Sequence, residues 1–246
     1  MHWVPTRIVL DIFFLAIFLA LTACEPADSS ETALNKILPL GASRVQGAHP
    51  HYESYRYALW QDLIDGEWDF DIIGSVKDDA YYKKYKGLRF DNDHEGRGGW
   101  TSTEIRVGLP YWLSLIAPPD IVLFSSPGGN DILQGEEITT IVENVSEIIS
   151  MLREANPNVT IIIEEMAPGK KQFMIDQGLY DPMVLVRNEI RIIAASRSSL
   201  QSKISVVDMH TGFHDSLLAD DVHYNTAGAE FIASRYYEVL ANELRR

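Results

Sequence analysis

The chain has 246 residues, of which 46% are hydrophobic and 10% aromatic, enough for one globular domain with a sizeable core. Its 35 acidic and 21 basic residues give a formal net charge of −14 at pH 7. This charge argues against binding to nucleic acid through its phosphates and predicts a soluble, anionic surface.

The first segment has the layout of a secretory signal. Arg7 precedes an apolar run over residues 12–20, which is too short for a comfortable membrane span. The run is followed by Leu21-Thr22-Ala23-Cys24, which resembles a bacterial lipobox. We therefore predict a signal peptide over residues 1–23, cleavage before Cys24, and a lipid on the Cys24 thiol.

Two alternatives to a lipoprotein are an uncleaved anchor and a chance cysteine at the end of an ordinary signal. Cys24 is the only cysteine, so no internal disulfide can form. Residues 24–33 are polar, and we predict that they form a flexible tether. The remaining residues, 34–246, are predicted to form one folded domain. A lipid on Cys24 predicts a location in the bacterial cell envelope, periplasmic or at the cell surface, with membrane contact through the lipid alone.

After the tether, apolar runs of strand length alternate with amphipathic segments of helix length, a pattern typical of a parallel sheet covered by helices on both faces. The predicted strands are residues 36–40, 70–74, 120–125, 160–164 and 204–208. The predicted helices are residues 52–63, 101–115, 136–155, 181–199 and 226–244. We expect an α/β fold, a three-layer, flavodoxin-like sandwich with a five-stranded parallel sheet and functional residues beyond the carboxyl ends of the strands.

Ser43 is the first candidate functional residue along the chain. It ends the run Gly41-Ala42-Ser43 directly after the first predicted strand, where the chain must turn towards a helix. A serine hydroxyl is a poor nucleophile at neutral pH unless a neighbouring base accepts its proton. A lone serine in this position is more often an ordinary turn residue. A catalytic role for Ser43 therefore requires a histidine that can act as its base.

His223 can supply that base, in the run Asp220-Asp221-Val222-His223 before the last predicted helix. An unperturbed imidazole, with a pKa of about 6.5, can take the serine proton and return it to the leaving group. Asp220 can fold back onto the ring and orient it, as the acid of a triad does, whereas we expect Asp221 to point away. The alternative is a surface loop with two helix-capping aspartates.

Donors for a developing oxyanion are found in two further runs. Asn130, in Gly129-Asn130-Asp131 after the third predicted strand, carries a neutral side-chain amide that can meet a carbonyl oxygen as it becomes negative. Gly99, in Gly98-Gly99-Trp100, adds a backbone amide, since glycine permits the unusual dihedrals of such a loop. With the amide of Ser43 these groups make three donors. Taken alone, the runs around Asn130 and Gly99 are more often structural turns than parts of a catalytic site.

These four runs resemble the four blocks of the SGNH hydrolases, in the GDSL esterase and lipase superfamily, over nearly the whole chain after the signal. The resemblance assigns the named serine, glycine, asparagine and histidine to Ser43, Gly99, Asn130 and His223, with Asp220 completing the triad. Gly98 is an alternative for the glycine, but the residue directly before the Trp-Thr pair matches better. A looser likeness, over residues 55–75 and 94–100, is to family members that deacetylate carbohydrates.

Two residues beside the nucleophile are unusual. Ala42 stands where the family has an aspartate. Because that aspartate is not the triad acid, we expect activity to survive, with an effect on rate and substrate choice. Arg44 could bind an anionic group of a substrate or be a solvated surface arginine.

Other aromatic and histidine residues leave alternatives open. The rings of Tyr81, Tyr82, Tyr85 and Trp100 lie in or beside a long polar stretch and could stack on sugar faces or anchor a loop. The histidines considered for a metal lack the convergent spacing of a zinc site, so we propose no metal; they are His49, His51, His94, His210 and His214. No glycine-rich phosphate loop is present, and we expect no cofactor.

The sequence therefore predicts a lipid-anchored serine esterase that hydrolyses a small acyl ester, with acetyl as the first candidate, on a carbohydrate through an acyl-enzyme. The substrate is a small-molecule or glycan ester. A second enzyme hypothesis is a lysophospholipase or thioesterase with the same catalytic groups. A third is a carbohydrate-binding lipoprotein without turnover, suggested by Ala42 and the aromatic loop.

Overall fold

The computed structural model describes residues 1–2 and 34–246. The predicted lipidation site Cys24, the predicted tether and nearly all of the predicted signal peptide lie outside the described residues. In the described part of the chain, none of the helices combines the length and the apolar composition of a membrane span.

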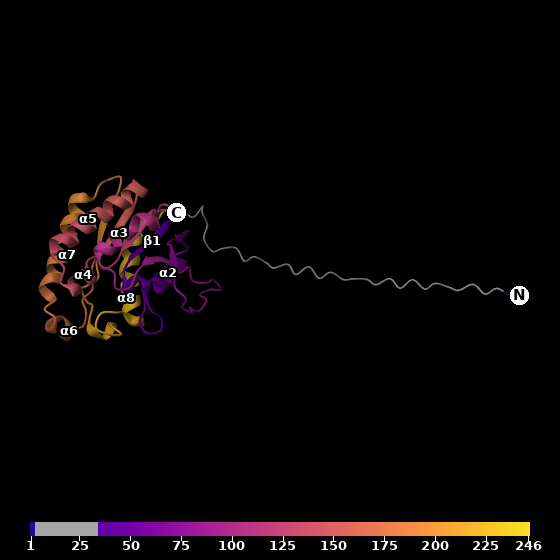
Figure 1. Cartoon of the computed structure of the whole chain (residues 1–246), viewed down its shortest axis with the longest axis horizontal. Coiled ribbons are helices and arrows are strands. Elements are labelled where there is room, and N and C mark those ends of the chain that lie inside the picture. Colours follow the sequence, from indigo (N-terminus) through magenta and orange to yellow (C-terminus); the bar gives the residue numbers. More distant parts are fainter. Residues whose placement is uncertain (3–33) are drawn as a thin grey trace.

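A mainly parallel sheet forms the middle layer of the molecule (Figure 1). Its five predicted strands are β1 (Lys36–Gly41), β2 (Asp71–Ile72), β5 (Ile121–Phe124), β6 (Thr160–Glu165) and β7 (Ile204–Asp208). All four pairings among them, in the order β2, β1, β5, β6, β7, are parallel. This is the flavodoxin-like order, so the predicted fold class is confirmed.

The sheet has seven strands, where the sequence pattern predicts five. The two additions are β3 (Val76–Lys77) and β4 (Asp93–Gly96). Strand β4 pairs in parallel with the end of β1, beyond the point where β2 pairs with its start, and β3 pairs antiparallel with β4. Both additions were missed because they are short and rich in charged residues, without the apolar run that marks a buried strand.

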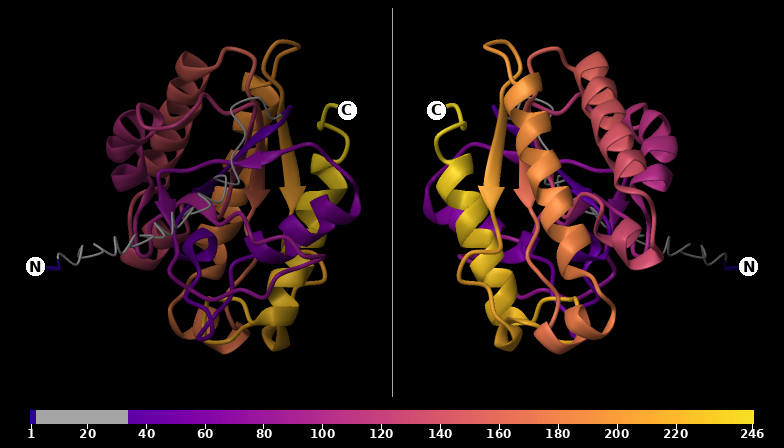
Figure 2. Two further views of the ribbon diagram at one scale, coloured as in Figure 1. Left: turned by 90° about the vertical axis from the view of Figure 1, so that its right-hand side faces the viewer. Right: turned by 90° about the vertical axis from the view of Figure 1, so that its left-hand side faces the viewer.

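Helices cover both faces of the sheet (Figure 2). One face packs against α3 (Ser102–Leu113), α5 (Ile138–Ala155) and α7 (Tyr180–Arg197), and the other against α2 (Arg56–Asp65) and α8 (Thr226–Leu240). Along β1 the side chains alternate between the two cores, as strand geometry requires. Leu38 and Leu40 belong to the first core, and Ile37 belongs to the second.

Four short helical segments follow the carboxyl ends of strands. They are α1 (Ser43–Gln46) after β1, α4 (Gly129–Gln134) after β5, α6 (Lys171–Asp176) after β6 and the 3-10 turn η1 (Asp215–Leu217) after β7. None is long enough to show a helical period in the sequence. They bring the candidate functional residues together at one end of the sheet.

Candidate active site

Ser43, His223 and Asp220 form one chain of hydrogen bonds. Ser43 is the first residue of α1, directly beyond β1, and His223 lies in the loop that leads into α8. The Nε2 atom of His223 is 2.9 Å from the Oγ atom of Ser43, and its Nδ1 atom is 2.7 Å from Oδ2 of Asp220. The fold thus brings together two residues that are 180 positions apart in the sequence.

The carboxylate against the ring is that of Asp220. Its Oδ1 atom accepts the amides of Val222, at 2.9 Å, and His223, at 2.7 Å. Partial burial raises the pKa of Asp220, but these two amides and the His223 ring outweigh burial, so the pKa of Asp220 is lowered. Asp221 is exposed, and its backbone carbonyl accepts the amide of Lys170 at 2.8 Å.

Tyr52 lies flat against the imidazole of His223. The ring centroids are 3.9 Å apart and the ring planes differ by 14°. The segment that carries Tyr52 is held there because the amide of Glu53 donates to the carbonyl of Tyr224 at 2.8 Å. Burial and the charge of Asp220 raise the pKa of Tyr52, which keeps its phenol neutral. Sequence reasoning missed Tyr52, because only the fold places it near residue 223.

Of the predicted oxyanion donors, the structure places Asn130 beside the serine. The Nδ2 group of Asn130 donates to the carbonyl of Trp100 at 2.8 Å, which leaves its second N–H for another acceptor, and Asn130 lines the same hollow as Ser43. Gly99 has a φ of 81°, a left-handed conformation that favours glycine. The amide of Gly98 donates to Oε1 of Gln46 at 2.6 Å, whereas that of Gly99 has no acceptor among the described residues.

The acidic neighbour of Asn130 anchors the loop around Trp100. Asp131 is buried and accepts both the amide of Ser102, at 2.9 Å, and its hydroxyl, at 2.5 Å. The run Gly129-Asn130-Asp131 therefore binds the loop that contains Gly98 and Gly99 through two successive side chains.

Arg44 has neither of the two roles expected from the sequence. Its side chain is buried, and each of its three nitrogens donates to a backbone carbonyl. Nε binds Val222 at 2.9 Å, Nη1 binds Ala167 at 2.8 Å, and Nη2 binds Pro168 at 3.3 Å. Because a buried charge must be hydrogen-bonded, these carbonyls hold the guanidinium inside the protein. Arg44 thereby ties the helix of the nucleophile to the loop of His223.

A second buried arginine holds the other end of α1. Arg56, only 1% exposed, donates from Nε to the carbonyl of Val45 at 2.7 Å and from Nη2 to that of Gln46 at 2.9 Å. Its charge is paired with that of Asp78, whose Oδ2 atom is 2.6 Å from Nη2 of Arg56. A cation at a helix carboxyl end is favourable. Arg44 and Arg56 together thus hold the short helix that carries Ser43.

Two hollows lie in this part of the molecule. The first, called here the apolar hollow, opens to solvent and includes Ser43 and Asn130 in its wall. The second, called the tyrosine hollow, adjoins the segment of Tyr52 and contains none of the three hydrogen-bonded residues in its lining. Its lining includes His49, Glu53, Tyr57, Gln61, Tyr81, Tyr82, Lys83 and Glu230.

The aromatic residues of the polar stretch divide between the two expected roles. Tyr82 packs against Tyr57 and Phe90, and its hydroxyl binds Asp78 at 3.3 Å, so it anchors the loop. Trp100 likewise packs against Trp112, with 5.4 Å between ring centroids. Tyr81 is 81% exposed and is free to stack on a ligand.

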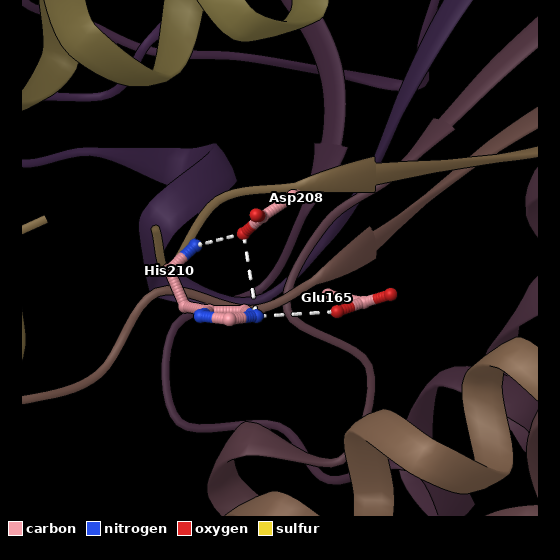
Figure 3. Close-up of side chains that lie close together, drawn as sticks. All are labelled: Glu165, Asp208 and His210. Carbon is pink, nitrogen blue, oxygen red and sulfur yellow. Dashed lines mark hydrogen bonds and ion pairs between the residues drawn. The ribbon is translucent and has the colours of Figure 1, made fainter. Parts of the chain in front are cut away.

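One of the histidines considered for a metal lies in a small polar cluster. Nε2 of His210 is 3.3 Å from Oε2 of Glu165 and 3.4 Å from Oδ1 of Asp208, at the ends of β6 and β7 (Figure 3). Such a trio could hold a cation. However, the guanidinium of Arg191 binds both oxygens of Glu165, each at 2.5 Å, and already supplies the positive charge. We assign no metal to this cluster.

A hydrogen-bonded serine, histidine and aspartate at the carboxyl edge of an α/β sheet have the geometry of a serine hydrolase. The chain belongs to the GDSL-like lipase/acylhydrolase family, whose model matches residues 77–231. The match includes Gly99, Asn130, Asp220 and His223. The protein is therefore a carboxylic ester hydrolase.

Solved structures with the same fold include several esterases. A family 3 carbohydrate esterase from Talaromyces cellulolyticus is 24% identical, with a TM-score of 0.72 over 85% of this chain and 97% of that chain. A mutant acetyl esterase with acetate ion is 24% identical, with a TM-score of 0.73 and coverages of 85% and 97%. The family 3 carbohydrate esterase of Clostridium thermocellum is 24% identical, with a TM-score of 0.66 and coverages of 85% and 96%. No curated protein matches the chain.

Proposed function

We propose that the protein is a serine esterase that removes a small acyl group, such as acetyl, from a carbohydrate. Ser43 attacks the ester carbonyl while His223 takes the hydroxyl proton, and Asp220 stabilises the imidazolium that forms. His223 then returns the proton to the leaving alcohol, and water hydrolyses the acyl-enzyme by the same route. The observation that carries the proposal is the hydrogen-bonded chain from Ser43 through His223 to Asp220.

Three donors are proposed to hold the oxyanion: the amide of Ser43, the amide of Gly99 and the side-chain amide of Asn130. The Ser43 amide begins α1 and has no backbone acceptor among the described residues, as is usual for the first turn of a helix. One N–H of Asn130 remains after its bond to Trp100. Loss of one such donor typically lowers kcat by about 10²- to 10³-fold.

A carbohydrate as the alcohol part of the ester is supported by the tyrosine hollow. It combines the exposed ring of Tyr81 with carboxylate, amide and amine groups, which together can stack on and hydrogen-bond a sugar. The esterase structures similar in fold include proteins described as carbohydrate esterases and an acetyl esterase. These likenesses support the proposed substrate class.

The test is hydrolysis of an activated acetyl ester, with a burst of product as the acyl-enzyme forms. We expect Ser43→Ala and His223→Ala each to lower kcat by about 10⁶-fold, as in other triads. A fluorophosphonate probe should label Ser43 in the wild type and not in Ser43→Ala. Full activity of both variants, with unchanged thermal melts, would show that other residues carry the reaction. Tight glycan binding without labelling would favour the carbohydrate-binding alternative.

A second candidate function is hydrolysis of longer acyl chains, as in a lysophospholipase or thioesterase. The observation that favours it is the apolar hollow beside Ser43. Comparison of acetylated oligosaccharides with lysophospholipids and acyl thioesters separates the two functions.

We further infer that the hydrolase domain over residues 34–246 is held at a membrane of the bacterial envelope by a lipid on Cys24, through a tether over residues 24–33. The support is the sequence run Leu21-Thr22-Ala23-Cys24 after the apolar segment.

A further inference from the structure

Glu164 is a buried carboxylate that has no role in the proposed reaction. It is the second-last residue of β6, and its exposed fraction is 0%. Burying a charge is costly unless the charge is hydrogen-bonded. The hydrogen-bond partners of Glu164 therefore indicate what the carboxylate does at this place in the fold.

Each oxygen of the Glu164 carboxylate accepts two hydrogen bonds. Oε1 accepts the hydroxyls of Ser125, at 2.8 Å, and of Tyr236, at 2.7 Å. Oε2 accepts the backbone amide of Ser126 at 2.8 Å and the hydroxyl of the same residue at 3.1 Å. All four partners are donors, which suits a carboxylate because it can only accept. Glu164 thus binds the segment that directly follows β5.

The two bonds to Ser126 hold an unfavourable backbone conformation. Ser126 has a φ of 46°, in the left-handed region that residues other than glycine rarely adopt. A residue stays in such a conformation only where the surrounding structure holds it. Oε2 of Glu164 does so here, since it binds both the amide and the side chain of Ser126.

Ser126 begins the turn that leads to Asn130. Its carbonyl accepts the amide of Gly129 at 3.0 Å, and Asn130 is the second residue of α4, which starts at Gly129. A change in the dihedral angles of Ser126 would therefore move the start of α4 and the side chain of Asn130 with it. A catalytic group must be held within about 0.5 Å of its productive position, so the conformation of Ser126 matters for the oxyanion site.

We propose that Glu164 is a positioning residue for the oxyanion site: it holds Ser126 in its left-handed conformation and thereby keeps the side-chain amide of Asn130 beside Ser43. This inference rests on the proposed function, since it takes Asn130 as a donor to the oxyanion of the ester reaction.

The experiment measures kcat and KM for 4-nitrophenyl acetate in two backgrounds, the wild type and Asn130→Ala. Glu164→Met removes the acceptors but keeps the length of the side chain. In the wild type it should lower kcat by up to about 10²-fold, as a misplacement of about 1 Å can. KM should change little, because an oxyanion donor acts in the transition state. In Asn130→Ala the further loss should be less than about threefold, because the group that Glu164 positions is already absent.

Glu164→Gln tests whether an acceptor for the Ser126 amide is sufficient. Its amide oxygen can still accept that N–H, and hydroxyl groups can turn to accept from its NH₂ group, so kcat should stay within about threefold of the wild type. If Glu164→Met fails to fold, Glu164→Asp takes its place in the comparison, since its carboxylate is one methylene further from Ser126.

Glu165→Met is the matched control. Glu165 is the next residue of β6 and is 6% exposed, but it pairs with Arg191 of α7. The variant loses a buried carboxylate from the same strand and should keep the kcat of each background.

Equal losses from Glu164→Met in the two backgrounds overturn the inference. Glu164 would then act through another group, such as Arg44, whose Nη1 atom is 3.4 Å from Oγ of Ser126. A Glu164→Gln variant as slow as Glu164→Met also overturns it. Wild-type kcat in Asn130→Ala removes Asn130 from the oxyanion site and the inference with it. If Ser43→Ala is as active as the wild type, the proposed function itself is wrong.

Discussion

The carboxylate that orients His223 can be identified by mutating two adjacent aspartates. Oδ2 of Asp220 is 2.7 Å from Nδ1 of the ring, whereas Asp221 takes part through its backbone carbonyl, which accepts the amide of Lys170. We expect Asp220→Asn to lower kcat by up to about 10⁴-fold, because the amide no longer selects the ring tautomer that accepts the serine proton. Asp221→Asn is the control and should retain wild-type kcat. Equal losses in the two variants would contradict the assignment of Asp220.

The stacking of Tyr52 on His223 predicts a role in positioning the base. Tyr52→Leu should lower kcat/KM by about threefold to tenfold, since an aromatic pair contributes about 0.5–1.5 kcal/mol beyond its buried area. Tyr52→Phe retains the ring and should stay within about twofold of the wild type. KM should change little in Tyr52→Leu. If Tyr52→Phe is as slow as Tyr52→Leu, the hydroxyl and not the stacked ring is important.

Residues of the site differ in how far the sequence could predict them. Four of them could be recognised, because they lie in short runs that follow one another in a fixed order along the chain: Ser43, Gly99, Asn130 and His223. Tyr52 could not be found in this way, because its position depends on the pairing of Glu53 with Tyr224. Arg44 was misjudged for a related reason. The carbonyls that bury its charge belong to residues 167, 168 and 222, which no local pattern connects to residue 44.

At the scale of elements, the long buried strands were predictable and the short polar ones were not. The predicted bounds of β1, β5, β6 and β7 lie within a residue or so of the observed ones, since each is an apolar run. Strand β4 contains His94 and Glu95, both buried, and the carboxylate of Glu95 is held by two groups outside the strand. Oε1 of Glu95 accepts the amide of Ser75, and Arg97 pairs with its other oxygen. Those partners are visible only after folding.

Three aspartates, Asp71 in β2, Asp93 in β4 and Asp91 just before β4, interact with one another and make stability depend on pH. Burial, followed by the charges of Asp93 and Asp71, raises the pKa of Asp91 to about 7, although the amide of Ile72 opposes the rise. The unfolded chain releases this proton near pH 4. The folded protein therefore loses stability as the pH rises from about 4 to 7, and the loss is complete above pH 7.

Asp91→Asn tests this effect because an asparagine oxygen can still accept the amide of Ile72, now bound at 2.9 Å. We expect the variant to raise the free energy of unfolding at pH 8 by on the order of 2 kcal/mol and to change it little at pH 4. Urea denaturation at the two pH values measures both quantities. A variant that is equally destabilised at pH 4 and pH 8 would show that burial of the ionised carboxylate is not the cause.

At the scale of the whole molecule, the proposed lipid on Cys24 can be tested by following the protein to the membrane. We expect the wild type to sediment with membranes and to incorporate labelled palmitate in a bacterial host. Cys24→Ser should do neither, while its soluble form keeps the wild-type kcat on a small ester. Ser43→Ala is the control, because it should remain lipidated although inactive. Palmitate label in Cys24→Ser would contradict the assignment.

The hydrogen bond between Ser43 and His223 also links the beginning of the hydrolase domain to its end. Residue 43 follows the first strand, and residue 223 precedes the last helix, α8, which packs on α2. A chain still being synthesised has its nucleophile long before its base, so it cannot use the triad until the segment with His223 has been made and has folded onto Ser43. Recovery of activity during refolding should therefore coincide with the last step that completes the native structure. The order of the catalytic residues along the chain therefore delays the reaction until the last part of the domain has been made.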